Sequence, residues 1–201
     1  MPTFTLPGIP GELRWTHQPA EWQVGLDGSL NILAGRNTNW FIDPGGNEPT
    51  DTAPAGLFSP PDASFLLSAK LRVDFASTFD AGALQLRCRD DLWAKLCFEY
   101  SPQAQPMIVS VVTRGVSDDC NSVVIDGREV YLRMAHTPRA TAFHYSADGR
   151  HWHMVRYFSL GELPSLRAGF SSQSPRGQGC RSIFSEIRYT AGVVKDNRSG
   201  E

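Results

Sequence analysis

Residues 79–100 read FDAGALQLRCRDDLWAKLCFEY, and this stretch decides the expected fold. Two runs in it, residues 83–89 and 93–100, alternate between apolar and polar side chains, and the polar pair Asp90-Asp91 lies between them. Alternation of this kind is typical of a strand with one buried face. A short polar connection between two such runs favours a hairpin. We therefore predict two adjacent antiparallel strands here.

The alternation also predicts which side chains of these strands face the core, because successive side chains of a strand point to opposite faces of the sheet. The apolar members form the inward set, and the polar members form the outward set together with Trp93 and Cys97. The inward set is Leu84, Leu86, Cys88, Ala94, Leu96, Phe98 and Tyr100; the outward polar set is Gln85, Arg87, Arg89, Lys95 and Glu99.

Similar runs recur along the rest of the chain, separated by turn signals such as Asp27-Gly28, Asp126-Gly127 and Asp148-Gly149. A helical turn is expected only at residues 160–166. Because many short strands without a long periodic helix are typical of a sandwich, we predict an all-β fold of two antiparallel sheets. The further predicted strands are residues 21–26, 29–33, 65–73, 107–113, 122–125, 130–135, 141–145, 153–159, 168–172 and 181–189.

One long segment, residues 37–61, interrupts this pattern and is rich in glycine, proline and acidic residues. Long connections inside a compact domain are usually functional or poorly ordered. We expect part of this loop to be functional. We also expect the stretch from Gln173 to Gly177 to form a loop at the edge of the site.

Composition limits the classes of function. The chain has 201 residues, a formal net charge of −2 and no apolar run long enough to span a membrane, so we expect one domain over residues 1–201 and neither nucleic-acid nor membrane binding. The first residues lack the basic and apolar regions of a signal peptide, which predicts a cytoplasmic protein. The four cysteines, Cys88, Cys97, Cys120 and Cys180, are then expected to be reduced thiols.

Several segments together resemble a known family. They are Trp22 with Asn39-Trp40-Phe41, residues 79–100, SVVTRGVSD (110–118), YSADGRHW (145–152) and AGFSSQSPRGQG (168–179). They are similar to the domain-of-unknown-function family 1349, also described as regulation of enolase protein 1-like, over residues 15–190, which leaves a short polar tail at 191–201. The resemblance implies a concanavalin A-like jelly roll and does not imply a particular activity. The chain departs from the family after Asp118, where Asp119 replaces a frequent tryptophan.

The outward side chains suggest a ligand site. If the outward rows lie on one curved sheet, they line a groove on its concave face, where lectin-like sandwiches tend to bind ligands. A carbohydrate or a sugar-containing metabolite would then be held by hydrogen-bonding groups and stacked on tryptophan. The same alternation is also typical of an ordinary solvated sheet face. The candidate ligand-binding residues are Trp40, Gln85, Arg87, Trp93, Lys95, Glu99, Thr113, Arg133 and His144.

Two other functions remain open. A protein-interaction module that regulates a metabolic enzyme would need an exposed apolar patch, for which Phe41, Leu57 and Phe58 are candidates. A glycoside hydrolase would need a second carboxylate near Glu99, which is the single acid of its predicted strand. The chain has no P-loop, no dinucleotide-binding glycine pattern and no G-x-S-x-G motif, so we expect no catalytic residue of those types, no cofactor and no metal.

Overall fold

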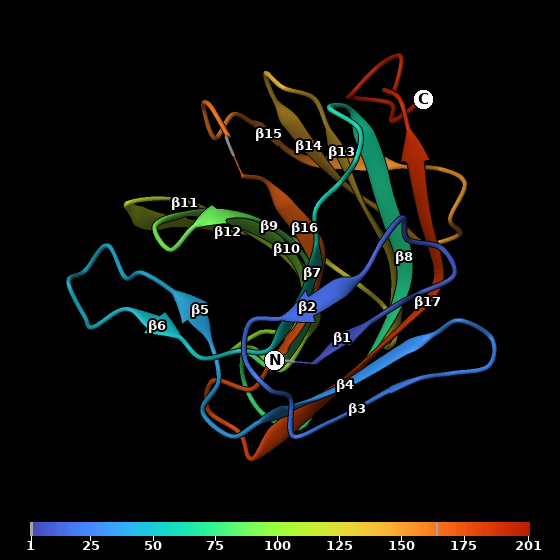
Figure 1. The fold of residues 1–201 in the computed structure, drawn as a ribbon. Coiled ribbons are helices and arrows are strands. Elements are labelled where there is room, and N and C mark those ends of the chain that lie inside the picture. The colour runs from blue at the N-terminus through green and yellow to red at the C-terminus, as the bar shows by residue number, and fades with distance from the viewer. Residues whose placement is uncertain (1, 164) are drawn as a thin grey trace.

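The computed structural model describes residues 2–163 and 165–201, and in them every regular element is a β-strand. Figure 1 shows their arrangement. The strands are β1 (Thr3–Phe4), β2 (Leu13–Trp15), β3 (Glu21–Val24), β4 (Leu30–Gly35), β5 (Trp40–Phe41), β6 (Thr50–Asp51), β7 (Ala55–Phe58), β8 (Phe65–Asp74), β9 (Ala81–Arg89), β10 (Leu92–Tyr100), β11 (Pro106–Arg114), β12 (Val116–Val124), β13 (Glu129–His136), β14 (Thr141–Ser146), β15 (His153–Phe158), β16 (Arg167–Gln173) and β17 (Gly179–Ala191).

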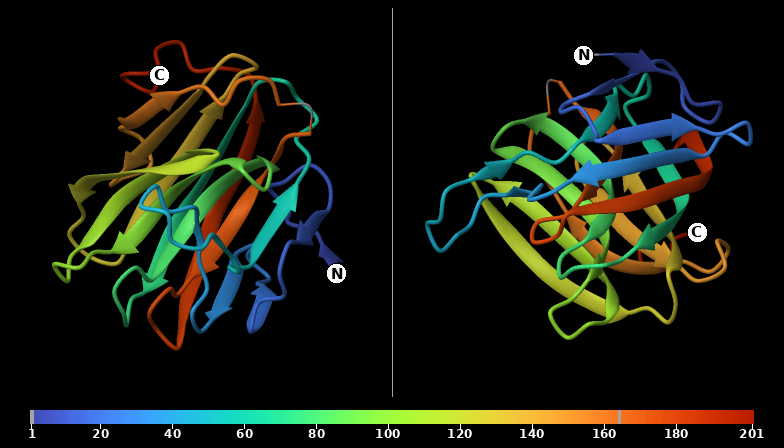
Figure 2. Two further views of the ribbon diagram at one scale, coloured as in Figure 1. Left: turned by 90° about the vertical axis from the view of Figure 1, so that its left-hand side faces the viewer. Right: turned by 90° about the horizontal axis from the view of Figure 1, so that it is seen from below.

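The strands form two large antiparallel sheets that pack together as a jelly-roll sandwich (Figure 2). One sheet has eight strands in the order β1-β2-β7-β16-β9-β10-β11-β12, and the other has seven in the order β15-β14-β13-β8-β17-β4-β3. Strands β5 and β6 pair only with each other, in a small hairpin beside the eight-stranded sheet. No helix of the described residues is long and apolar enough to cross a membrane.

The predicted strand pattern is confirmed in its main features. Strands β9 and β10 pair as an antiparallel hairpin, with Lys95 opposite Gln85 and Leu96 opposite Leu84. Each other predicted run overlaps a strand, although β12 begins at Val116 and not at residue 122. The fold class is therefore the one expected from alternation.

The segment 37–61 corrects the prediction of one long loop. It contains β5, β6 and β7, and β7 lies inside the eight-stranded sheet between β2 and β16. All four residues of β7 are buried, and its sequence AGLF accordingly shows no polar–apolar alternation by which the strand could be predicted. The predicted helical turn at 160–166 is also absent from residues 160–163 and 165–166, and residue 164 lies outside the described residues.

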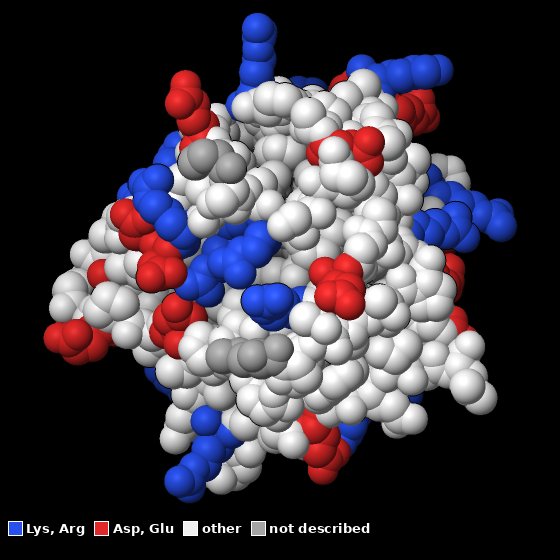
Figure 3. Space-filling view, in the orientation of Figure 1, with Lys and Arg blue, Asp and Glu red and all other residues white. Residues whose placement is uncertain are grey.

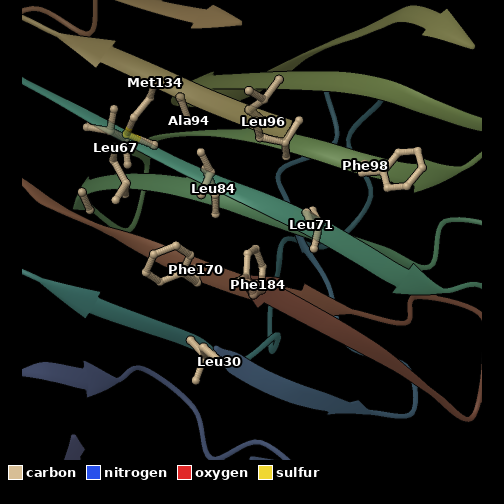
Figure 4. Packing of buried hydrophobic residues seen from close by; sticks show 14 of the residues in the cluster. Leu30, Leu67, Leu71, Leu84, Ala94, Leu96, Phe98, Met134, Phe170 and Phe184 are labelled. Atoms are coloured by element: carbon tan, nitrogen blue, oxygen red, sulfur yellow. The ribbon is translucent and has the colours of Figure 1, made fainter. Parts of the chain in front are cut away.

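The core lies between the two large sheets. Leu84, Leu96 and Phe98 of the eight-stranded sheet belong to one buried cluster with Leu71 and Phe184 of the other sheet (Figure 4). Each such side chain contributes about 1.5–3 kcal/mol when it is fully buried. The predicted inward set is confirmed, and this burial determines which side chains of β9 and β10 are left on the opposite face.

The surface shown in Figure 3 carries lysine and arginine side chains interspersed with acidic ones. All four cysteines are free thiols; three are buried and Cys120 is exposed.

Candidate functional site

The candidate site lies on the outer face of the eight-stranded sheet, by which we mean the face turned away from the seven-stranded sheet. Strand register places Gln85, Lys95, Val111 and Asp119 in one row across β9, β10, β11 and β12. Glu99 lies on the same face, four residues beyond Lys95 on β10. The polar side chains expected from alternation are thus neighbours on one surface.

A segment of the chain crosses this outer face. Residues 38–53, which we call the strap, include the β5–β6 hairpin (Figure 1). At one end, the Thr38 amide donates to the Ser174 carbonyl at 3.1 Å. In the middle, Lys95 Nζ donates to the Trp40 carbonyl at 2.8 Å. Further along, the Ser117 amide donates to the Ile42 carbonyl at 2.8 Å.

Trp40 anchors the strap on the sheet. Its side chain is 2 % exposed, and its ring meets Trp93 edge to face at a centroid distance of 6.0 Å. The Arg87 guanidinium lies 4.0 Å from the ring centroid, a cation–π contact. Trp40 Nε1 donates to the Ala53 carbonyl at 2.6 Å, and Arg87 also binds the Asp51 carboxylate at 3.1 Å. The strap therefore covers this part of the outer face.

Beside the strap, the outer face opens into a pocket of about 120 Å³, which we call the outer-face pocket. Lys95 Nζ donates to Gln173 Oε1 at 2.8 Å within it, which orients both side chains. Phe79 has a φ of 70° and carries the Arg176 guanidinium 4.7 Å from its ring centroid. The lining residues are Asn39, Phe41, Phe79, Lys95, Glu99, Val111, Asp119, Gln173 and Pro175.

The pocket changes the protonation of its acids. Burial raises the pKa of Glu99 to about 8; the charge of Lys95 opposes this shift, and Asp119 adds to it. Glu99 is therefore mostly a neutral carboxylic acid at pH 7. The pKa of Asp119 is also raised, mainly because the surrounding protein desolvates its carboxyl group, although the side chain reaches solvent. The pocket thus combines an ammonium group, a neutral acid and a second carboxyl group.

The nine predicted ligand-binding residues are distributed over four places. Only Lys95 and Glu99 line the outer-face pocket. Gln85, Arg87, Trp93 and Thr113 lie on the same sheet face but are buried, and Trp40 belongs to the strap itself. Trp93 is 2 % exposed, so the expectation of a stacking platform open to solvent is wrong for this residue.

Arg133 and His144 require a correction, because they do not lie with the other predicted residues. They face each other across β13 and β14 of the seven-stranded sheet. Arg133 donates to the Gly200 carbonyl at 2.7 Å, and His144 Nε2 lies 2.7 Å from the Asn197 carbonyl oxygen. Alternation assigns a residue to an outward face but does not say to which sheet its strand belongs.

The sequence reasoning missed most of the pocket walls. The predicted strand at 122–125 begins six residues after the true start of β12, so the prediction leaves Asp119 outside the strand. Phe41 and Phe79 come from the strap and from the segment before β9, where no alternation marks them. Gln173 ends β16, within the stretch that was expected to lie at the edge of the site. The signal available was the set of resemblance segments Asn39-Trp40-Phe41, 79–100, 110–118 and 168–179, which contain every residue of the pocket lining except Asp119.

The expected apolar patch for a protein partner is also corrected. Leu57 and Phe58 are each 2 % exposed, and Phe41 is half-buried beside the outer-face pocket. The large apolar side chains that are exposed among the described residues are spread over several elements: Leu26, Val116, Val124, Tyr157 and Val193.

A larger cleft of about 750 Å³ lies elsewhere, lined by residues 59–63, by Cys88 and His136 and by residues near β16. Its polar groups are largely paired within the protein. His136 Nδ1 lies 2.9 Å from Thr141 Oγ1, and Asp62 accepts a hydrogen bond from Tyr189 at 2.9 Å. Among the described residues, no cluster of three or more His, Cys, Asp or Glu side chains is arranged to hold a metal ion.

The fold and the site define a class: a jelly-roll β-sandwich with a small pocket on the outer face of one sheet. Within that class, residues 15–192 match the family described as Protein of unknown function (DUF1349), and the chain belongs to this family. A comparison with curated proteins gives no match.

Solved structures show the same fold. A functionally unknown protein from Saccharomyces cerevisiae is 20% identical, with a TM-score of 0.81 over 90% of this chain and 97% of that chain. The GH43 protein BlXynB from Bacillus licheniformis is 15% identical, with a TM-score of 0.69 over 92% of this chain and 38% of that chain. The alginate lyase from Klebsiella pneumoniae is 10% identical, with a TM-score of 0.57 over 85% of this chain and 84% of that chain.

Proposed function

We propose that this protein binds a carbohydrate or a sugar-containing metabolite in the outer-face pocket. The observation that carries the proposal is the composition of the pocket, whose lining combines the polar residues Lys95, Glu99 and Gln173 with the aromatic residues Phe41 and Phe79. Ligand pockets in proteins commonly have apolar walls and a few polar groups that orient the ligand.

The chemistry of these groups suits a sugar. A neutral Glu99 both donates and accepts hydrogen bonds, as a hydroxyl group requires. Lys95 donates, Gln173 both donates and accepts, and the aromatic walls suit the apolar faces of a sugar ring. A pocket of about 120 Å³ suits one sugar unit or the end of a chain better than a drug-sized ligand. The similarity in fold to the alginate lyase, and to a xylan beta-1,4-xylosidase from Bacillus halodurans that is 14% identical, is in keeping with this ligand class.

Thermal unfolding in the presence of sugars tests the proposal. We would add xylose, arabinose and xylobiose at millimolar concentration to the purified protein at pH 7. A ligand at a hundredfold excess over its Kd adds about 2.7 kcal/mol to the unfolding free energy, which is about 5–10 °C in Tm for a chain of this size. No shift with any sugar of a wider panel would contradict the proposal.

Variants of Glu99 sharpen the test. Glu99→Ala removes both hydrogen-bonding atoms and should abolish the sugar-induced shift. Because the raised pKa leaves Glu99 neutral at pH 7, glutamine is a close mimic, and we expect Glu99→Gln to keep most of the shift. Glu12→Ala, an exposed glutamate outside the pocket, is the matched control.

A hydrolase is the second candidate, because Asp119 supplies the second carboxyl group that the sequence did not place near Glu99. In this reaction Glu99 would transfer its proton to the glycosidic oxygen as the bond to the anomeric carbon breaks. Water would add to that carbon, and Asp119 would take the proton from the water. Glu99→Gln would then bind an oligosaccharide without releasing reducing sugar. If the wild-type protein binds an oligosaccharide but releases no reducing sugar from it, the hydrolase is contradicted and the binding function stands.

A further inference from the structure

Gln85 is the most unusual polar side chain of the outer face. It is fully buried on β9, and neither its amide oxygen nor its amide nitrogen has a hydrogen-bond partner among the described residues. The Nε of Arg87, two residues along the same face, is also unpaired. Because an unpaired buried polar group is costly, native structures that retain one usually have a reason to keep it.

The position of Gln85 connects it to the outer-face pocket. In the strand register it lies opposite Lys95, which forms part of the pocket floor. On its other side lies Gly169 of β16, which has no side chain to occupy the outer face. The polar row of the pocket therefore continues past Lys95 towards β16. Lys95 itself donates a hydrogen bond to the carbonyl of Trp40, which is a residue of the strap, so this polar row lies next to the strap.

The strap is built as a small separate element. Its hairpin pairs only Trp40 with Asp51 and Phe41 with Thr50, and the hairpin is not part of either large sheet. Residues 44–52 at its tip are exposed to solvent. It is attached to the outer face by the buried side chains of Trp40 and Ala53, by the ion pair between Asp51 and Arg87, and by a few hydrogen bonds.

We infer that Gln85 and Arg87 form a second saccharide subsite beneath the strap, which a chain of several sugar units reaches when the strap lifts. The inference rests on the proposed function, since the first unit occupies the outer-face pocket. Sugar hydroxyl groups both donate and accept hydrogen bonds, so they can pair the amide oxygen, the amide nitrogen and the guanidinium Nε that are unpaired in the closed form. A single sugar unit would leave the strap closed.

The test compares xylose with xylotetraose by calorimetric titration of three proteins: wild type, Gln85→Leu and Gln23→Leu. Gln23 is an exposed glutamine on β3 of the other sheet, so the same substitution there is a matched control. We expect xylotetraose to bind wild type at least about tenfold more tightly than xylose, which corresponds to about 1.4 kcal/mol. Gln85→Leu should remove this gain without changing the affinity for xylose.

Hydrogen exchange on the wild-type protein gives a second readout that needs no variant. The amides of residues 38–53 should change their exchange when xylotetraose is bound, and not when xylose is bound. Unaltered exchange in the strap, or a gain that survives in Gln85→Leu, would overturn the subsite. Xylose binding with no gain for xylotetraose would also overturn the subsite and would leave the proposed function standing. Binding of neither sugar would contradict both.

Discussion

Glu99 shows how one residue gains its properties from its surroundings. In sequence it is an ordinary outward glutamate on an alternating strand. In the structure it lies in a pocket where burial raises its pKa to about 8, in spite of the nearby Lys95 ammonium group. Desolvation disfavours the charged carboxylate more than one cation favours it. The result is a neutral acid that donates a hydrogen bond at neutral pH.

This shift predicts a pH dependence of stability. Between pH 4.5 and about 8 the unfolded chain has lost the proton of Glu99 while the folded protein still holds it, so the unfolding free energy falls as pH rises. The slope from this group is at most about 1.4 kcal/mol per pH unit. Glu99→Gln should flatten the decline between pH 6.5 and 8, as measured by urea unfolding. Parallel curves for wild type and variant would show that the pKa is not raised.

Trp93 carries a second prediction at this scale. Because Trp93 is buried beneath the strap and contacts Trp40, its replacement by alanine leaves a cavity. We expect Trp93→Ala to lower the unfolding free energy by about 3–5 kcal/mol. Chemical unfolding of the free protein measures this. A loss below about 1 kcal/mol would mean that Trp93 is not part of a packed cluster.

At the scale of elements, the close approach of β7 and β16 determines how the chain continues after the strap ends. Gly169 of β16 pairs with Leu57 of β7, and a Cβ atom built on Gly169 would lie 2.0 Å from the Gly56 carbonyl oxygen. A side chain there cannot be accommodated without moving backbone. The absence of a Cβ thus allows β7 to join the sheet directly after the strap.

Gly169→Ala tests this packing. We expect it to destabilise the protein by about 1–3 kcal/mol, because the new methyl group must separate two paired strands. Gly35→Ala is the matched control, since a Cβ at Gly35 meets nothing within 4 Å and that glycine also lies in a strand. The control should be neutral or slightly stabilising. Equal Tm values for the two variants in a thermal melt would refute the close approach.

At the scale of the whole molecule, groups on both sheets combine to set the pH of greatest stability. Burial lowers the pKa of His136 and of His144 to about 4. Both lie on the seven-stranded sheet, and the C-terminal segment covers His144 through Asn197. As pH falls from 6.5 to 4, the unfolded chain gains two protons that the folded protein does not, so acid lowers stability.

The opposite slopes predict a maximum. Between pH 4.5 and 6.5 the two histidines make stability rise with pH, and they outweigh the single proton of Glu99. Above pH 6.5 the decline from Glu99 remains. The raised pKa of Asp119 also makes stability fall with rising pH, starting from the ordinary pKa of an aspartate. We expect the unfolding free energy to be greatest near pH 6.5. Urea unfolding between pH 4.5 and 8.5 measures it, and a monotonic profile would contradict the assignment.

The sequence by itself determined the fold class and two of the nine residues that line the outer-face pocket. Alternation in residues such as Leu84 and Gln85 separates an inward from an outward face, because a strand has a period of two and its apolar side must be buried. That argument is local, and it correctly placed Lys95 and Glu99 on one surface. It failed for β7, whose residues are buried on both faces and show no period.

Only the tertiary structure decided which outward faces meet and which are covered. Arg133 and His144 are outward like Gln85, yet they lie on the other sheet, because strand order depends on contacts between residues far apart in the chain. Trp40 covers part of the outer face through its contacts with Arg87 and Trp93, which lie about 50 positions away in the chain. These are long-range packing choices, and no local pattern encodes them. The position of the pocket beside the strap follows from them.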